Sequence, residues 1–202
     1  NDQALREHDA CGVGFVARAT GERSHEIVRM ALQAVARVAH RGAASTDNSG
    51  DGAGILTQIP TRLFHREAYR LQIKLEPGQP FGVGFLFLPP EPDALAHAIG
   101  RVERILEQCG LPLLGWRDVP HDLAALGPQA RQSCPAIRQV FVGRPATIDD
   151  DDAWERQLYL ARRDMEREAE AEGDLTFFVC SLSCRTIVYK ALLTGTQLPA
   201  FY

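Results

Sequence analysis

The run FGVGFLFL, positions 81–88, carries no polar side chain, and Pro89 and Pro90 follow it at once. An apolar run of this length predicts a buried strand, because strands commonly span about four to eight residues and helices are longer. The prolines predict its end, since proline has no backbone N–H to donate to a sheet. The fold must therefore contain a sheet that buries this strand.

Other segments show either short apolar runs or helical spacing. The apolar runs predict strands over residues 12–17, 55–59, 112–118, 137–142, 177–183 and 186–190, of which the last two resemble a strand pair. Apolar residues at helical spacing predict helices over residues 25–39 and 92–108. We also expect a short helix over residues 61–71 and a charged helix, rich in Arg and Glu, over residues 151–171. Strands and helices mix without strict βαβ alternation, which predicts a layered α+β fold.

Local signals refine two of these helices. Ser24 is a good N-cap for the first helix, and Gly42 predicts its end, with His40 and Arg41 in its last turn. There they would interact with the last carbonyls of the helix, although Arg41 could instead brace the following loop against Asp47 or Asp51. The many charged residues of 151–171 predict a solvated helix face.

Composition excludes several classes of protein. The chain has 202 residues, enough for one domain or two small ones, and a formal net charge of −4, so no bulk electrostatic attraction to nucleic acid is expected. No apolar run reaches the ~18 residues of a membrane span. The first ten residues are too polar for a secretory signal.

The five cysteines favour a reduced, cytoplasmic setting. Their number is odd and no CxxC motif occurs, so neither a disulfide framework nor a tetrahedral zinc site is supported. We expect four of them to act as small buried hydrophobic residues: Cys109, Cys134, Cys180 and Cys184.

The fifth cysteine, Cys11, has a different context. It stands before the apolar segment 12–17 and behind a polar stretch, NDQALREHDA. If residues 1–10 were removed, its own α-amino group, with a pKa near ~8, could accept the thiol proton. The residues alone leave two interpretations open, a structural cysteine and an N-terminal nucleophile.

The polar, glycine-rich segment 43–54 also admits a metal-binding interpretation. Asp47, Ser49, Asp51 and Gly52 match the start of an EF-hand calcium loop, but Gln58 stands where a bidentate carboxylate is needed and a strand is predicted there. No histidine is spaced for metal binding. We therefore expect no metal site in this chain.

Several motifs, taken in order, resemble one family. They are CGVGF, HRGA (40–43), TDNSGDGAGI (46–55), GWRDVP (115–120), IRQVFV (137–142), FFVCSLS, TIVYK and LPAFY. Together they resemble the N-terminal glutaminase domain of the glutamate synthase large subunit. That domain is a class II glutamine amidotransferase with the N-terminal-nucleophile hydrolase fold, a four-layer αββα sandwich of two antiparallel sheets.

The resemblance implies a role for Cys11. Residues 1–10 would be a leader that is removed, and residues 11–202 would be the N-terminal part of the amidotransferase domain. The Cys11 thiolate would attack the side-chain amide of L-glutamine and release ammonia through a glutamyl thioester. The ammonia would pass to a synthase domain that acts on 2-oxoglutarate. FMN, an iron–sulfur cluster, and a small electron-donating subunit or ferredoxin would belong to the rest of the enzyme.

One departure limits this comparison. The family's glutamine-binding arginine and aspartate and its Asn-Gly oxyanion donors follow the LPAFY-like segment, whereas this sequence stops at Tyr202. Its two asparagines, Asn1 and Asn48, are not followed by glycine. We therefore expect a sandwich that is incomplete at its C-terminus and carry over Cys11 alone. The alternative function is a catalytically incomplete structural or binding module.

Overall fold

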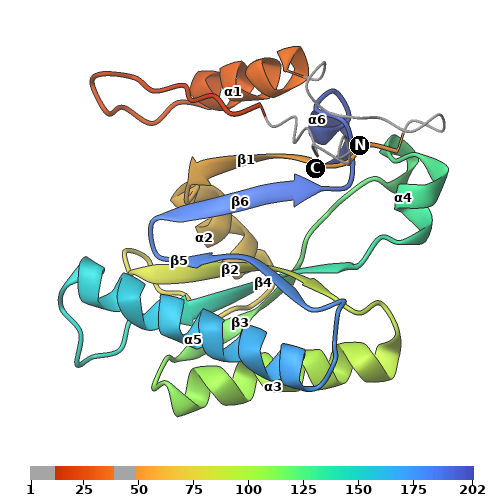
Figure 1. The fold of residues 1–202 in the computed structure, drawn as a ribbon. Coiled ribbons are helices and arrows are strands. Elements are labelled where there is room, and N and C mark those ends of the chain that lie inside the picture. Colours follow the sequence, from red (N-terminus) through yellow and green to blue (C-terminus); the bar gives the residue numbers. More distant parts are fainter. Residues whose placement is uncertain (1–11, 39–48) are drawn as a thin grey trace, which may run out of the picture. The chain divides into compact units, whose positions relative to one another are not determined.

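The computed structural model describes residues 12–38 and 49–202, and it divides into two compact units (Figure 1). The smaller unit combines Asn1–Ile55, His121–Ser133 and Lys190–Tyr202. The larger unit combines Leu56–Pro120 and Cys134–Tyr189. Strands β1 (Ala53–Gln58) and β6 (Thr186–Ala191) pair with each other, and the division between the units falls within both strands.

The centre of the larger unit is a four-stranded sheet in the order β3-β4-β2-β5. The strands are β2 (Phe81–Leu88), β3 (Leu113–Asp118), β4 (Ala136–Gly143) and β5 (Phe178–Ser183), and each printed pairing is antiparallel. Every residue of β2 except Phe87 is buried, as the apolar run predicts. One row of directly opposed residues crosses all four strands: Arg117, Gln139, Phe85 and Ser181.

Two long helices cover one face of this sheet, α3 (Pro92–Gln108) and α5 (Asp151–Ala171) (Figure 1). Both have the predicted bounds. Asp150 caps α5 by accepting hydrogen bonds from the backbone N–H groups of Asp152 at 3.2 Å and Ala153 at 2.9 Å. Their apolar stripes and one face of the sheet form the main core, which includes Leu86, Val140, Leu158 and Met165.

The opposite face of the sheet receives helix α2 (Thr61–Arg70) and strand β6. The ring of Phe64 on α2 lies edge-on to Phe141, with 5.3 Å between ring centroids. The ring of Tyr189 on β6 lies 5.0 Å from that of Phe85. Within the larger unit the sheet therefore has helices on one face and a strand with a helix on the other.

The expectation that residues 177–183 and 186–190 form a strand pair is wrong. β5 pairs with β2, whereas β6 pairs with β1 in the second sheet. The Oγ atom of Ser183 accepts the N–H groups of Arg185 at 3.0 Å and Thr186 at 3.1 Å, and that of Ser181 accepts the N–H of Val188 at 3.1 Å. These serine side chains take up backbone donors just after β5, so the chain turns into another sheet rather than into a hairpin.

The smaller unit contains helix α1 (His25–Arg37), capped by Ser24, whose Oγ atom accepts the N–H of Glu26 at 3.1 Å. The helix ends two residues earlier than predicted, and His40, Arg41 and Gly42 lie outside the described residues. Among its described residues the unit also holds the short helices η2 (Leu123–Ala125), α4 (Pro128–Gln132) and α6 (Leu198–Phe201).

The strand predicted over residues 12–17 is absent from the structure. These residues have no regular secondary structure, and the side chains of Val13 and Phe15 are 94% and 95% exposed. An apolar sequence can form a strand only where another strand offers its backbone groups, and none of the described strands pairs with this segment. No helix within the described ranges has the length and apolar character needed to cross a membrane.

Candidate active site

The proposed nucleophile, Cys11, lies just outside the described residues, which begin at Gly12. The three residues after Gly12, Val13 to Phe15, are exposed. The other motif segments can be located, beginning with the glycine-rich loop 43–54, of which residues 49–54 are described.

The second half of this loop, residues 49–54, packs closely against the C-terminal segment of the smaller unit. The buried Ser49 accepts the backbone N–H of Ala130 at 3.3 Å through its Oγ atom. A Cβ atom on Gly50 would collide with the backbone of Leu193, so only glycine fits there. Gly52 has a φ of +135°, which side-chain-bearing residues rarely adopt. Gly50 therefore serves a close backbone approach, and Gly52 an unusual backbone conformation.

The calcium interpretation of residues 47–58 does not match the local structure. The second half of that pattern forms strand β1, as the apolar run 55–59 predicts, where an EF-hand needs an exiting helix. Asp47 and Arg41 lie outside the described residues, and Asp51 is exposed. Within residues 12–38 and 49–202, no group of three His, Cys, Asp or Glu residues is placed to hold a metal ion.

The LPAFY motif has a packing role in the smaller unit. The backbone carbonyl of Phe201 accepts the N–H of Asp122 at 2.9 Å, and its ring lies 5.2 Å from that of His121. The Tyr202 hydroxyl donates to the backbone carbonyl of Lys190 at 2.8 Å. These contacts join the motif to residues 121–122 and to Lys190. The motif therefore helps to hold the segment that contains Leu193, against which Gly50 packs.

Of the four remaining cysteines, only Cys180 is buried. The expectation that all four are buried is therefore wrong for Cys109, Cys134 and Cys184, which are partly exposed. The Cys184 thiol donates to Oε2 of Glu155 at 3.0 Å. Burial, with the hydrogen bond and negative charge of Glu155, raises the pKa of Cys184 to about 12. This thiol is protonated at neutral pH and is a poor nucleophile.

A chain of polar side chains crosses the larger unit, with Arg117 and Gln139 buried and Glu67 and Tyr189 half-buried, and the sequence patterns did not predict it. The Arg117 guanidinium donates to Glu67 at 3.1 Å and to the Gln139 side-chain carbonyl at 2.9 Å. The Gln139 amide donates to the Tyr189 hydroxyl at 3.1 Å. Burial alone would raise the pKa of Glu67, but hydrogen bonds from Arg70 and Arg117 outweigh it and lower that pKa. Burial raises the pKa of Tyr189.

A signal for this chain of polar side chains was present in the sequence. Gln139 occupies an inward position of β4 between Ile137 and Phe141, which are both buried. A polar residue at an otherwise apolar period-two position implies a buried partner. Which residue that partner would be cannot be deduced from the strand itself.

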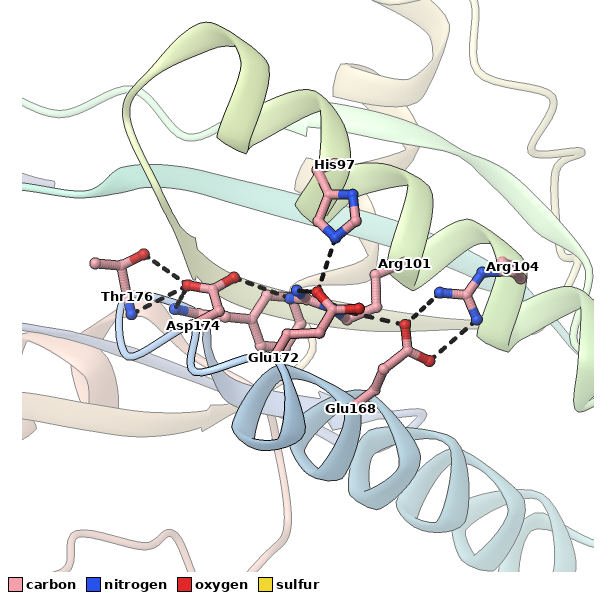
Figure 2. A network of polar contacts seen from close by, with 8 residues as sticks. His97, Arg101, Arg104, Glu168, Glu172, Asp174 and Thr176 are labelled. Atoms are coloured by element: carbon pink, nitrogen blue, oxygen red, sulfur yellow. Dashed lines mark hydrogen bonds and ion pairs between the residues drawn. The ribbon is translucent and has the colours of Figure 1, made fainter.

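A second cluster joins α3 to the end of α5 (Figure 2). Arg101 is only 1% exposed, and it donates to Glu172 at 2.6 Å and to Asp174 at 3.0 Å. Arg104 binds Glu168 through both terminal nitrogens, and the His97 ring lies 2.8 Å from Glu172. The face of α5 predicted to be solvated therefore carries, at its C-terminal end, carboxylates that pair with α3.

The pKa values of these carboxylates follow from their partners. The hydrogen bond from Arg104 lowers the pKa of Glu168, and those from His97 and Arg101 lower the pKa of Glu172. Burial opposes ionisation of Asp174, but hydrogen bonds from Thr176 and Arg101 still lower its pKa. Paired carboxylates of this kind remain ionised at neutral pH and are suited to holding elements together rather than to acid–base catalysis.

Comparison with known proteins agrees with the motif resemblance. A family model described as class II glutamine amidotransferases matches residues 11–202. The chain is 41% identical to the NADPH glutamate synthase large chain of Bacillus subtilis, over 97% of this chain and 13% of that protein.

Two ferredoxin-dependent relatives show similar identities. The chain is 41% identical to ferredoxin-dependent glutamate synthase 2 of Synechocystis over 98% of its length, and 40% identical to the chloroplastic ferredoxin-dependent enzyme of Oryza sativa over 100% of it. It covers 12% of each of these proteins. The family match extends over nearly the whole chain, and the chain therefore belongs to the class II glutamine amidotransferases.

Proposed function

We propose that this chain is the glutaminase domain of a glutamate synthase and that Cys11 is its nucleophile. The observation that carries the proposal is the position of the family match, which begins at residue 11 and continues to residue 202. The mixed α and β composition and the antiparallel sheet are compatible with the fold that this family implies. The raised pKa of Cys184 supports the choice of Cys11 over Cys184, because the Cys184 thiol stays protonated at neutral pH.

The chemistry requires that Cys11 be the first residue. Its free α-amino group accepts the thiol proton, and the thiolate sulfur bonds to the amide carbon of the glutamine side chain. The C–N bond then breaks, and the departing nitrogen takes up the proton to leave as ammonia. Water hydrolyses the glutamyl thioester, which releases glutamate and restores the thiol. While residues 1–10 remain attached, the nitrogen of Cys11 is an amide and cannot act as the base.

The proposal extends to the whole fold. It places the chain in a four-layer αββα sandwich, and it is supported by the succession of α3 and α5, the four-stranded sheet, and β6 within the larger unit. Ammonia would pass to a synthase domain acting on 2-oxoglutarate. FMN, an iron–sulfur cluster and the electron donor would lie outside this sequence, in a reducing, cytoplasmic compartment.

The test is intact mass spectrometry with N-terminal sequencing, before and after treatment with a glutamine-analogue electrophile. We expect a chain that begins at Cys11 and gains one adduct there. Because residues 1–202 alone are expected to be inactive, glutaminase activity is measured in the full-length protein. There, Cys11→Ala should abolish both the adduct and the activity, whereas the control Cys184→Ala should retain both. Retained glutaminase activity in Cys11→Ala would refute the assignment.

The leader is tested separately with two versions of the protein. A version produced without residues 1–10 should react with the electrophile at Cys11, and a version whose leader cannot be removed should not. Equal reactivity of the two versions would show that the amine is not the base. A processed chain that never reacts would favour the structural or binding module instead.

A further inference from the structure

The outer face of helix α2 carries cations at every turn. Arg62, Arg66 and Arg70 are four residues apart, so they lie on one side of the helix, with the 89% exposed side chain of Tyr69 beside them. All four residues are exposed. We refer to Arg62, Arg66, Tyr69 and Arg70 as the α2 face.

This arrangement is unfavourable for the helix itself. Like charges four residues apart repel each other, and a cation in the first turn opposes the positive end of the helix dipole. Arg62 occupies that first turn, which contains no acidic residue. Arg70 pairs with Glu67 at 3.1 Å, but none of the contacts described for Arg62 or Arg66 is with a carboxylate. Arg62 and Arg66 therefore do not serve the stability of α2, whereas Arg70 does, through Glu67 and its place in the last turn.

The helix that carries this face is nevertheless firmly held. Its inner residues Phe64 and Ala68 are 0% and 1% exposed, and Phe64 packs against both Phe81 and Phe141. The carboxylate of Glu67 binds the buried Arg117. A helix anchored in this way presents its outer side chains in a preorganised position, which reduces the entropy lost on binding.

We propose that the α2 face is a docking surface for an acidic protein segment. Arginine and tyrosine are residue types enriched at protein–protein interfaces, and here three arginines and one tyrosine lie on one face of an anchored helix. The arginines rise by about 6 Å per four residues along the helix. Carboxylates on one side of an extended peptide are spaced by about 6.6 Å, which matches that rise closely. The unmatched positive charge gives the surface its complementarity to Glu and Asp.

The test uses a fluorescent, extended peptide of alternating Glu and Ala, with fluorescence anisotropy as the measurement. We expect binding at low ionic strength that weakens as salt is added. The double variant Arg62→Glu, Arg66→Glu should weaken binding by about tenfold. The matched control is the double variant Arg156→Glu, Arg163→Glu on the exposed side of α5. It changes the net charge by the same amount, and its two positions lie on either side of another exposed tyrosine, Tyr159. This control should bind as the unmodified protein does.

Each other outcome overturns the proposal. Equal losses in both double variants would mean that only net charge matters. Equal binding of a peptide with Gln in place of Glu would exclude recognition of carboxylates. Tighter binding of a single-stranded oligonucleotide of the same charge would assign the face to nucleic acid. Circular dichroism controls for folding, and Arg62→Glu should not disrupt α2, since it places an acidic residue in the first turn. None of these results depends on Cys11.

Discussion

The two faces of the four-stranded sheet are both buried, but their chemistry differs. The face toward α3 and α5 is apolar, with Leu86, Val140 and Val142 packed on the helices. The face toward α2 and β6 combines aromatic rings with Arg117 and Gln139, whose polar atoms bond to Glu67 and Tyr189.

The difference shows how each layer is specified. An apolar face accepts any covering of about the right shape, because dispersion and the hydrophobic effect are not directional. A face with hydrogen-bonding groups accepts only a covering that supplies the matching donors and acceptors. The polar face therefore selects β6 and α2, and the apolar face mainly stabilises the sheet.

The largest effect is expected on the apolar face. Leu86→Ala should lower the free energy of unfolding by about 3 kcal/mol, because Leu86 is 1% exposed and its loss leaves a cavity. Leu86→Met should cost less than about 1.5 kcal/mol, since volume and polarity are nearly kept. Urea denaturation measures both changes. Equal losses of unfolding free energy in Leu86→Ala and Leu86→Met would contradict the view that this face requires only the right side-chain volume.

On the polar face, Arg117→Met should lower the free energy of unfolding by about 2 kcal/mol, although methionine fills much of the same space. The reason is that the Gln139 carbonyl loses its donor, while Glu67 keeps Arg70. The control Arg138→Met, at a partly exposed residue of the same sheet, should cost less than about 1 kcal/mol. A negligible change in the free energy of unfolding for Arg117→Met would show that the hydrogen bonds of Arg117 add nothing beyond the packing of its side chain.

A smaller effect is expected for Tyr189→Phe, which removes one hydroxyl and leaves the ring against Phe85. Because the Gln139 amide then loses its buried acceptor, we expect a loss of about 1 kcal/mol. Tyr159→Phe on the exposed side of α5 should change the stability by less than about 0.5 kcal/mol. Thermal unfolding of the two variants, compared directly, decides the point.

The smallest effect should be the pH dependence that Glu67 contributes. Its pKa is lowered below the ordinary value of 4.5, so the folded state binds its proton less readily than the unfolded state. This stability is present above about pH 4.5 and is lost as the pH falls through the folded-state pKa. Denaturation measured against pH should show a shallower acid loss in Glu67→Gln. An unchanged profile would show that Glu67 does not contribute.

The sequence analysis was most successful where a pattern is local. The strand over residues 81–88 and the helices over residues 92–108 and 151–171 have the predicted bounds, and Ser24 caps α1. In each case the signal is an apolar period, a proline or a capping side chain within a few residues. The motif resemblance identified the family, which the family match then confirmed.

The main errors concern pairing partners, and one predicted strand is missing because none of the described strands lies beside it. Residues 12–17 have a strand-like sequence but no strand beside them, and β5 and β6 were predicted to pair with each other because they are adjacent in sequence. For the candidate site, Cys11 and Arg41 lie outside the described residues, so the role of Cys11 stays a prediction. The fit of Gly50 against Leu193 depends on residues far apart in the chain.

The sequence by itself determined most of the longer helices and strands, the family, and the choice of Cys11 as the candidate nucleophile, because these depend on residue types at short spacings. Only the tertiary structure decided that Arg117, Gln139 and Tyr189 form one polar chain, and that Arg101 is held between α3 and the end of α5. The partners in these contacts are 22 to 73 residues apart. Burial makes each polar group require a partner, but only the packing of the elements determines which residue that partner is.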